Sequence, residues 1–169
     1  MRDLAISCGK QAKVAIEGAD VEVDTAVIEA IRDPLTHMIR NALDHGLETP
    51  SAREAKDKSA IGRITLRAFH EAANIVIQVS DDGKGLSKEK ILARARKMSL
   101  GVDPDSLSEG DLFRLIFEPG FSTADQVTDV SGRGVGMDVV RKNIAALGGT
   151  VELDSAEGFG TRVSVRLPL

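Results

Sequence analysis

The order of apolar and polar residues along the chain predicts strand pairs separated by helices. In residues 62–70 and 74–80, apolar side chains occupy alternate positions, as in strands with one buried face. A short gap separates the two runs, so we expect them to form a hairpin. Two further strand-like runs, at 150–155 and 160–168, flank the turn AEGFG near the C-terminus.

Helical spacing marks other parts of the chain. Apolar residues at 35, 38, 39, 42 and 43 fall on one side of a helix. Asp33 is its expected N-cap, Pro34 lies in its first turn and Gly46 ends it. Ser87 is the expected N-cap of a further helix over 87–98. We further expect short strands around an acidic turn at 13–24, helices at about 25–31, 109–118 and 135–147, and an exposed polar segment at 49–60.

Residues 99–131 follow neither pattern, because Gly, Pro, Ser, Asp and Thr interrupt them throughout. Such a long irregular segment is uncommon in a compact domain, so we expect it to be functional or mobile. The order of elements is helix, two strands, helix, long segment, helix, two strands. Strand pairs joined by hairpins predict an α+β fold, a two-layer sandwich of a mixed, mostly antiparallel sheet with helices on one face.

The composition narrows the class of protein. The 169 residues suffice for one domain, and with five Phe but neither Tyr nor Trp the core must be aliphatic. The net charge of −4 argues against nucleic acid as a partner. Cys8 is the sole cysteine, so no internal disulfide forms, which fits a reducing compartment. No apolar run reaches the roughly 18 residues of a membrane span, and no signal peptide is visible, so we expect a cytoplasmic protein without membrane insertion.

Two glycine-rich stretches are candidates for ligand binding. In SGRGVGMDVV, Gly132, Gly134 and Gly136 precede a helix, where backbone amides favour an anion such as phosphate. A flexible hinge is the alternative, and the stretch fits neither the P-loop nor the G-x-G-x-x-G pattern. In DDGKGL, Asp81 ends a strand and could accept a hydrogen bond from an amino group, with glycines allowing close approach. A plain turn has the same composition.

A third candidate lies in the helical stretch DPLTHMIRNALDHG. His37, Asn41 and His45 recur every four residues and therefore share one face of the helix. The amide oxygen of Asn41 suits a hard cation such as Mg²⁺. A polar face whose hydrogen bonds are satisfied within the protein is the alternative. Dedicated zinc chemistry is disfavoured, because acidic ligands and the H-E-x-x-H pattern are missing.

Taken in order, these stretches resemble a known fold. An Asn-bearing helix, D-x-G-x-G, a long segment, G-x-G-x-G before a helix, and GFGT opening the last strand are similar to the Bergerat-type ATP-binding fold. That group includes histidine kinases, gyrase B, MutL and heat-shock chaperone ATPases, and the likeness covers residues 33–169. HMIRNALDHGLE, VSDDGKGL, IFEPGFSTADQVTDVSGRGVGMDVV and GFGTRVSVRLPL look like the catalytic ATP-binding domain of the CheA family of chemotaxis histidine kinases. RDLAISCGK resembles the start of that domain.

The resemblance implies a site for ATP and Mg²⁺. Asn41 would hold Mg²⁺ against the phosphates together with His37, and both would be catalytic. Asp81 would receive the adenine amino group, with Thr161 helping through water. Lys90 and Arg94 would face the phosphates, although a solvated helix face explains them nearly as well. The other residues implied to bind the nucleotide are Asp44, His45, Gly83, Gly85, Leu86, Ser122, Thr123, Gly132, Arg133, Gly134, Val135, Gly136 and Met137.

The resemblance also implies a domain organisation. The whole chain would be one ATP-binding domain, with residues 1–12 as the remnant of a linker from a dimerisation domain and residues 99–133 as an ATP lid. Phe117 and Phe121 would either clamp this lid or belong to the core. Dimerisation and adaptor-binding domains would be missing from the chain, and a receptor array and response regulators would be indirect partners.

Three classes of function remain open: a histidine kinase, a hydrolytic ATPase and a nucleotide-binding regulator without catalysis. In gyrase-like relatives, the position four before the magnesium asparagine is a glutamate that activates water. Here it is His37, which favours transfer over hydrolysis. We expect the γ-phosphoryl group to go to a histidine on a separate phosphoacceptor domain of the same kinase. The chain itself would stay unlabelled, because His37 and His45 belong to the site and His70 is an ordinary exposed or capping residue.

Overall fold

The computed structural model describes residues 9–18, 21–98, 107–121 and 136–169. Its centre is a five-stranded sheet in the order β1-β2-β3-β5-β4. Strand β1 runs parallel to β2, and the other neighbouring pairs are antiparallel. The strands are β1 (Ala12–Glu17), β2 (Gly62–Glu71), β3 (Asn74–Asp81), β4 (Thr150–Ala156) and β5 (Gly160–Pro168).

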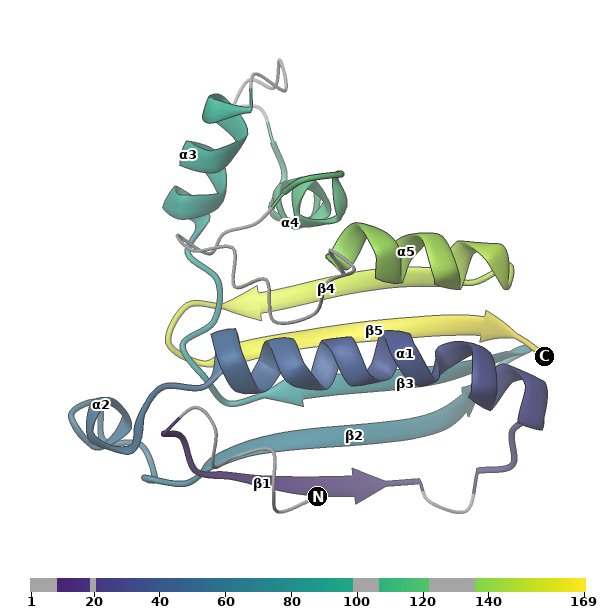
Figure 1. The fold of residues 1–169 in the computed structure, drawn as a ribbon, viewed down its shortest axis with the longest axis horizontal. Helices are drawn as coiled ribbons and strands as arrows, with labels where there is room; N and C mark the ends of the chain where they lie inside the picture. The colour runs from purple at the N-terminus through teal and green to yellow at the C-terminus, as the bar shows by residue number, and fades with distance from the viewer. Residues whose placement is uncertain (1–8, 19–20, 99–106, 122–135) are drawn as a thin grey trace.

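Helices cover one face of this sheet, which confirms the predicted α+β architecture. Helices α1 and α5 pack on the sheet and run along its strands, while α3 and α4 lie beyond the β4 edge (Figure 1). No described helix is long and apolar enough to cross a bilayer. The helices are α1 (Thr25–Asn41), α2 (Pro50–Glu54), α3 (Lys88–Lys97), α4 (Glu109–Arg114) and α5 (Met137–Ala146), with a π-helical turn η2 (Ala42–Gly46) after α1 and a 3-10 turn η4 (Leu115–Phe117) after α4.

The central strand β3 carries Asp81 at its C-terminal end, where the candidate site lies. Its alternating isoleucine and valine residues face the helices in the main core, as the sequence pattern predicts. Strands β2 and β5 flank it along its whole length. Its last residue, Asp81, is in register with Ile64 on one side and Thr161 on the other. The place of Asp81 is therefore fixed by the sheet and not by a loose turn.

Helix α1 differs from the sequence prediction because it continues through Pro34. The expected break with Asp33 as a second N-cap is wrong: one helix begins after Asp24, whose carboxylate accepts a backbone amide of the first turn at 2.7 Å. Pro34 removes one helical hydrogen bond. However, its ring is buried on the same side as Ile31 and Met38, which pack in the main core. This packing outweighs the lost hydrogen bond. The helical segment ends at Gly46, as predicted.

Two other segments also differ from the prediction. Of the strands expected in residues 13–24, the described residues form β1 alone, and residues 21–24 have no regular structure. The polar segment 49–60 is not uniformly exposed, because it contains α2 and the fully buried side chain of Arg53. Charged residues are seldom buried unless they are paired, so this burial indicates partners that the sequence does not reveal.

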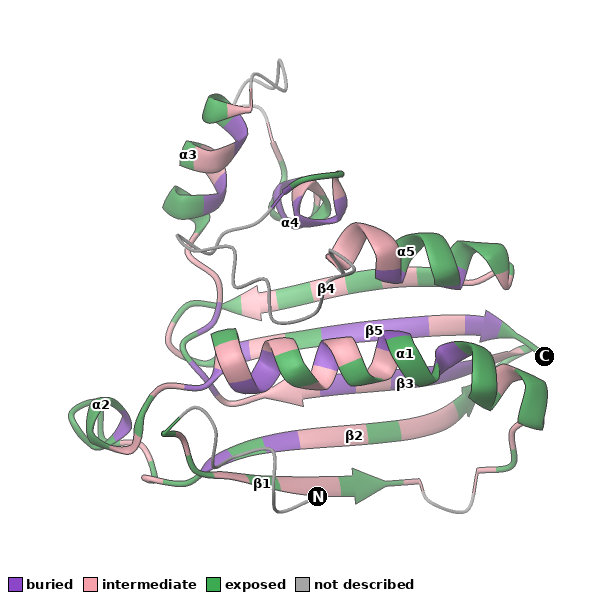
Figure 2. Cartoon of the chain, viewed as in Figure 1, coloured by how far each residue is buried: buried purple, intermediate pink, exposed green. Residues whose placement is uncertain are grey.

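A second, smaller core joins α3 to α4. Ile91 of α3 and Phe113 of α4 are among its buried members, and Figure 2 shows buried patches on both helices. Phe117 and Phe121 are both buried, at 5% and 7% exposed, and Phe121 belongs to this core. Of the two interpretations of these phenylalanines, the structure supports core packing.

Candidate nucleotide-binding site

The first part of the candidate site is the end of α1, which carries Asn41. The Nδ2 atom of Asn41 donates to Met137 Sδ at 3.3 Å, and this contact ties the end of α1 to the start of α5. No donor among the described residues bonds the Oδ1 atom of Asn41. The amide oxygen, which is the atom that a hard cation prefers, is therefore left for a ligand.

His37 lies one turn before Asn41 and is half-buried. Burial lowers the pKa of its imidazole, and the positive charge of Arg40, together with that of His45 when it is protonated, lowers the pKa further. Asp138 of α5 acts in the opposite direction. The imidazole is therefore neutral at pH 7, so one ring nitrogen accepts a hydrogen bond and the other donates one.

Asp44 and His45 lie in the π-helical turn η2. Burial lowers the pKa of the His45 imidazole, although the Asp44 carboxylate opposes this shift. Lys10 and Lys84 lower the same pKa further. Lys10 also donates to the carbonyls of Leu43 and Asp44 at 2.9 and 2.6 Å, which satisfies groups that a helix end leaves without partners. The segment before β1 therefore fixes the turn that carries His45.

The second part of the candidate site is Asp81, the last residue of β3. Its Oδ1 atom accepts the Gly83 amide at 2.9 Å. Burial raises the pKa of Asp81 to about 6, although the amides of Gly83 and Thr161 oppose the shift. The negative charges of Asp82 and Glu48 raise this pKa as well. A half-buried carboxylate at the end of a strand is suited to accept a hydrogen bond from the amino group of a ligand.

The two parts of the site meet at Gly46. A Cβ atom on Gly46 would lie 2.8 Å from Asp81 Oδ2, and a Cβ atom on Gly83 would overlap the Gly46 carbonyl. The Lys84 amide donates to that same carbonyl at 2.9 Å. The end of the helical segment and the end of β3 therefore touch through their backbones, which glycine permits because it has no Cβ atom.

The glycines of DDGKGL are explained by contacts inside the protein. Gly83 packs on Gly46, and Gly85 has a φ of +69° with its α-carbon against the carbonyl of Ala156. Any side chain at either position would overlap backbone atoms. The predicted approach of these glycines to a nucleotide stays a prediction, since the close approach in the structure is to the chain itself.

Ser155 of β4 connects residues that the sequence analysis treated separately. Its Oγ atom accepts the Leu86 amide at 2.9 Å and donates to the Gly160 carbonyl at 2.9 Å. It also lies 3.0 Å from Thr161 Oγ1. A serine has one hydroxyl hydrogen, which goes to Gly160, so Thr161 is the donor in this pair and keeps its lone pairs as acceptors. No sequence pattern singles out Ser155.

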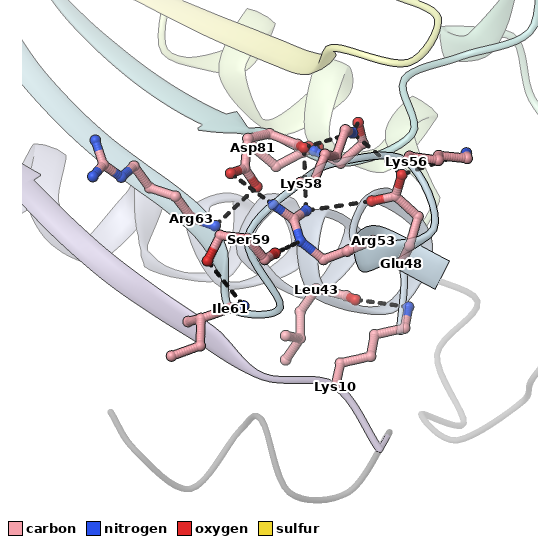
Figure 3. A network of polar contacts seen from close by, with 12 residues as sticks. Lys10, Leu43, Glu48, Arg53, Lys56, Lys58, Ser59, Ile61, Arg63 and Asp81 are labelled. Atoms are coloured by element: carbon pink, nitrogen blue, oxygen red, sulfur yellow. Dashed lines mark hydrogen bonds and ion pairs between the residues drawn. The ribbon is translucent and has the colours of Figure 1, made fainter. Parts of the chain in front are cut away.

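A cluster of charged residues, also missed by the sequence analysis, supports the loop after β3 (Figure 3). The Arg53 guanidinium pairs with Glu48 at 3.3 Å and with Asp82 at 2.9 Å. Lys58 pairs with the same Glu48 at 3.2 Å. Burial alone would raise the pKa of Glu48, but its own backbone amide and the neighbouring lysines lower it below its usual value. Arg53 and Asp82 are 29 residues apart, so no local pattern indicates the pair.

The remaining predicted site residues lie on α3, on α5 or outside the described residues. Lys90 is exposed on α3, which fits the solvated-face alternative, and Arg94 donates to the Gly120 carbonyl at 3.4 Å. Gly136 caps α5 and Met137 begins it. Ser122, Thr123, Gly132, Arg133, Gly134 and Val135 lie outside the described residues, together with the rest of the predicted lid except residues 107–121.

Comparison with known proteins defines the class of this site. Residues 30–169 match the family of histidine kinase-, DNA gyrase B- and HSP90-like ATPases, and the chain belongs to this family. The structure is similar to the crystal structure of full-length ShkA in complex with AMPPNP, with a TM-score of 0.61 and 22% identity over 99% of this chain and 27% of that chain. At this identity, the likeness shows a shared fold.

Within the family, the chain is similar to the chemotaxis protein CheA. It is 53% identical to CheA of Klebsiella aerogenes and 50% identical to CheA of Salmonella typhimurium. Each match covers the whole of this chain but only 26% and 25% of the relatives, so the chain spans about a quarter of their length. The family match and the similarity to CheA confirm the resemblance that the sequence motifs predict.

Proposed function

We propose that this chain binds Mg-ATP and transfers the γ-phosphoryl group to a histidine on a separate phosphoacceptor domain, as the kinase module of a chemotaxis-type two-component system. The contact at Gly46 carries the proposal, because it joins the helical segment that bears Asn41 to the strand end that bears Asp81. One element offers an amide oxygen to a cation, and the other offers a half-buried carboxylate to an amino group. A metal-bound adenine nucleotide has both groups.

The proposed contacts divide between the two ends of the nucleotide. Asp81 accepts the adenine amino group, and Thr161 contributes through water. Asn41 and His37 would hold Mg²⁺, which neutralises negative charge on the phosphates during transfer. In the part of the chain that the structure describes, no three His, Cys, Asp or Glu side chains gather into a metal site.

The residue type at position 37 supports transfer over hydrolysis. A hydrolytic site needs a base that takes a proton from water. In the hydrolytic relatives this base is a glutamate, and here its position is held by His37, whose pKa is lowered by burial and by the charge of Arg40. A neutral imidazole instead orients the terminal phosphate or the hydration shell of Mg²⁺ through hydrogen bonds. The nucleophile in this proposal is a histidine of the phosphoacceptor domain.

The proposed partners follow from the same assignment. Because the chain spans about a quarter of its CheA relatives, we place the phosphoacceptor, dimerisation and adaptor-binding domains in other parts of the same kinase. A receptor array and response regulators are the indirect partners, and the cytoplasm is the place of action. The linker at residues 1–12 and the lid at residues 99–133 belong to this proposal.

Replacing Asn41 with alanine is expected to remove the magnesium dependence of nucleotide binding. Calorimetric titration with a non-hydrolysable ATP analogue, with and without Mg²⁺, measures this effect. In Mg²⁺, the affinity of Asn41→Ala should fall roughly tenfold or more, the scale of losing one contact to a charged group. Asn143→Ala, the same change on the exposed face of α5, is the control. An Asn41→Ala variant with full magnesium-dependent affinity contradicts the proposal.

A further inference from the structure

The loop after β3 contains two successive peptide groups whose carbonyls are held by cations. The Asp82 carbonyl accepts hydrogen bonds from Lys58 Nζ at 3.0 Å and from Arg53 Nη1 at 3.2 Å. The Gly83 carbonyl accepts a second bond from Lys58 Nζ at 2.7 Å. Figure 3 shows Lys58 and Arg53 side by side at this loop. One ammonium group therefore holds two adjacent carbonyls.

The opposite end of each peptide group faces the candidate site. In a planar trans peptide, the C=O group and the following N–H group point in opposite directions. The Asp82 carbonyl shares its peptide group with the Gly83 amide, which donates to Asp81 Oδ1 at 2.9 Å. The Gly83 carbonyl shares its group with the Lys84 amide, which donates to the Gly46 carbonyl at 2.9 Å. Holding the two carbonyls therefore directs one amide at Asp81 and the next at Gly46.

We propose that Lys58 is a positioning residue for the nucleotide site, because by holding both peptide groups it orients the Asp81 carboxylate toward the adenine amino group. The assignment rests on the proposed function and adds to it a residue that acts through the backbone. Arg53 shares the first carbonyl, but its burial makes it part of the fold as well. The side chain of Lys58 is 19% exposed, so it can be replaced with a smaller effect on folding.

Lys58 also strengthens the hydrogen bond between Gly83 and Asp81. A cation on a carbonyl polarises the peptide group and makes its N–H a better donor. Burial raises the pKa of the Asp81 carboxyl, and the charges of Asp82 and Glu48 add to this rise. The Gly83 amide opposes it. Losing Lys58 therefore weakens a donor that keeps Asp81 ionised and in place.

Lys56 provides a matched control. Its ammonium group pairs with the same Glu48 at 3.6 Å, its side chain is 53% exposed, and among the described residues it makes no bond to a carbonyl of the loop. Lys56→Met and Lys58→Met each remove one positive charge beside Glu48. Only Lys58→Met releases the two carbonyls. Lys58→Arg keeps the positive charge and serves as the rescue variant.

The experiment compares an ATP analogue with the matching inosine analogue, which lacks the amino group, in the wild type and the three variants. We expect the wild type to prefer the adenine analogue and Lys58→Met to lose this preference roughly tenfold. Lys58→Arg should recover most of the preference, and Lys56→Met should keep it. In NMR spectra without nucleotide, the Gly83 amide proton should move upfield in Lys58→Met and stay in place in Lys56→Met.

The readouts distinguish positioning from loss of charge. Full preference in Lys58→Met with an unmoved Gly83 amide signal overturns the role of Lys58, and so does an equal loss in both lysine variants. A wild type that binds the two analogues equally, or binds neither, overturns the proposed function and this role with it. The NMR spectra also show that each variant is folded, and Lys58→Gln replaces Lys58→Met where the latter melts below the assay temperature.

Discussion

Replacing Asp81 with asparagine is expected to weaken adenine nucleotide binding strongly without lowering the stability of the fold at neutral pH. The substitution keeps the acceptor for the Gly83 amide but replaces the second carboxylate oxygen with an NH₂ group. In the proposed complex that group meets the adenine amino group, so two donors face each other. A buried group left without a partner costs roughly 1–3 kcal/mol, and we expect the affinity for an ATP analogue to fall about 100-fold.

The effect on stability follows from the pKa of Asp81. Burial raises this pKa from 3.8 to about 6, so the folded state binds the proton more tightly than the unfolded state. The contribution of the carboxyl group to stability is therefore greatest below about pH 4 and is lost as the pH rises through about 6. The shift corresponds to about 3 kcal/mol. Asparagine does not ionise, so it avoids the cost of burying a charge. It has one acceptor oxygen in place of two, so it gives up one of the two backbone hydrogen bonds that the carboxylate accepts from Gly83 and Thr161.

Thermal melts of both proteins between pH 4 and 8 measure this difference. The melting temperature of Asp81→Asn relative to the wild type should rise with pH up to about 6 and then stay constant. Asp154→Asn, which changes an exposed carboxylate on β4, should show neither the rise nor a loss of nucleotide binding. If Asp81→Asn melts well below the wild type at pH 8, or still binds the analogue tightly, the role given to Asp81 is wrong.

Arg53→Met is expected to cause the largest loss of stability. The substitution leaves the Glu48 carboxylate, whose side chain is 7% exposed, without its buried partner. It also removes the donors to the carbonyls of Ser59 at 2.6 Å and Asp82 at 3.2 Å. Breaking a buried ion pair from one side costs about 3–5 kcal/mol. This is a large part of the roughly 5–15 kcal/mol that stabilises a typical domain.

Urea unfolding of Arg53→Met measures this loss. Arg63→Met is the matched control, because Arg63 is exposed and bonds Asp82 through its backbone amide. The double variant Glu48→Gln with Arg53→Met should recover part of the loss, since it removes the unpaired charge. A cost below about 1 kcal/mol, the range of an exposed ion pair, shows that the cluster does not hold the loop.

The elements with a strict repeat of apolar residues could be predicted from the sequence. The strands β2 to β5 and the helices α3 and α5 form where alternation or helical spacing places them, because one face of each is buried in a core. The break at Pro34 could not be judged locally. Whether a proline ends a helix depends on the packing of the turns around it, which only the folded chain provides.

In the candidate site, the residues that lie in short motifs could be predicted, and those whose partners are distant in the sequence could not. Asn41 and Asp81 lie in short motifs that the sequence displays, and their roles come from the family resemblance. Ser155 and Arg53 could not be found, because their partners Leu86 and Asp82 are 69 and 29 residues away. The sequence shows that DDGKGL is rich in glycine, but only the structure shows which backbone approaches each glycine.

Incubation with labelled ATP and Mg²⁺ tests most directly whether this chain is a kinase module that acts on a separate domain. We predict that the chain alone stays unlabelled, and that adding the phosphoacceptor domain of a CheA-type kinase places acid-labile label on that domain. Asn41→Ala should abolish this transfer, and Asn143→Ala should keep it. Stable label on this chain without the added domain, or release of free phosphate with no label on that domain, contradicts the proposed function.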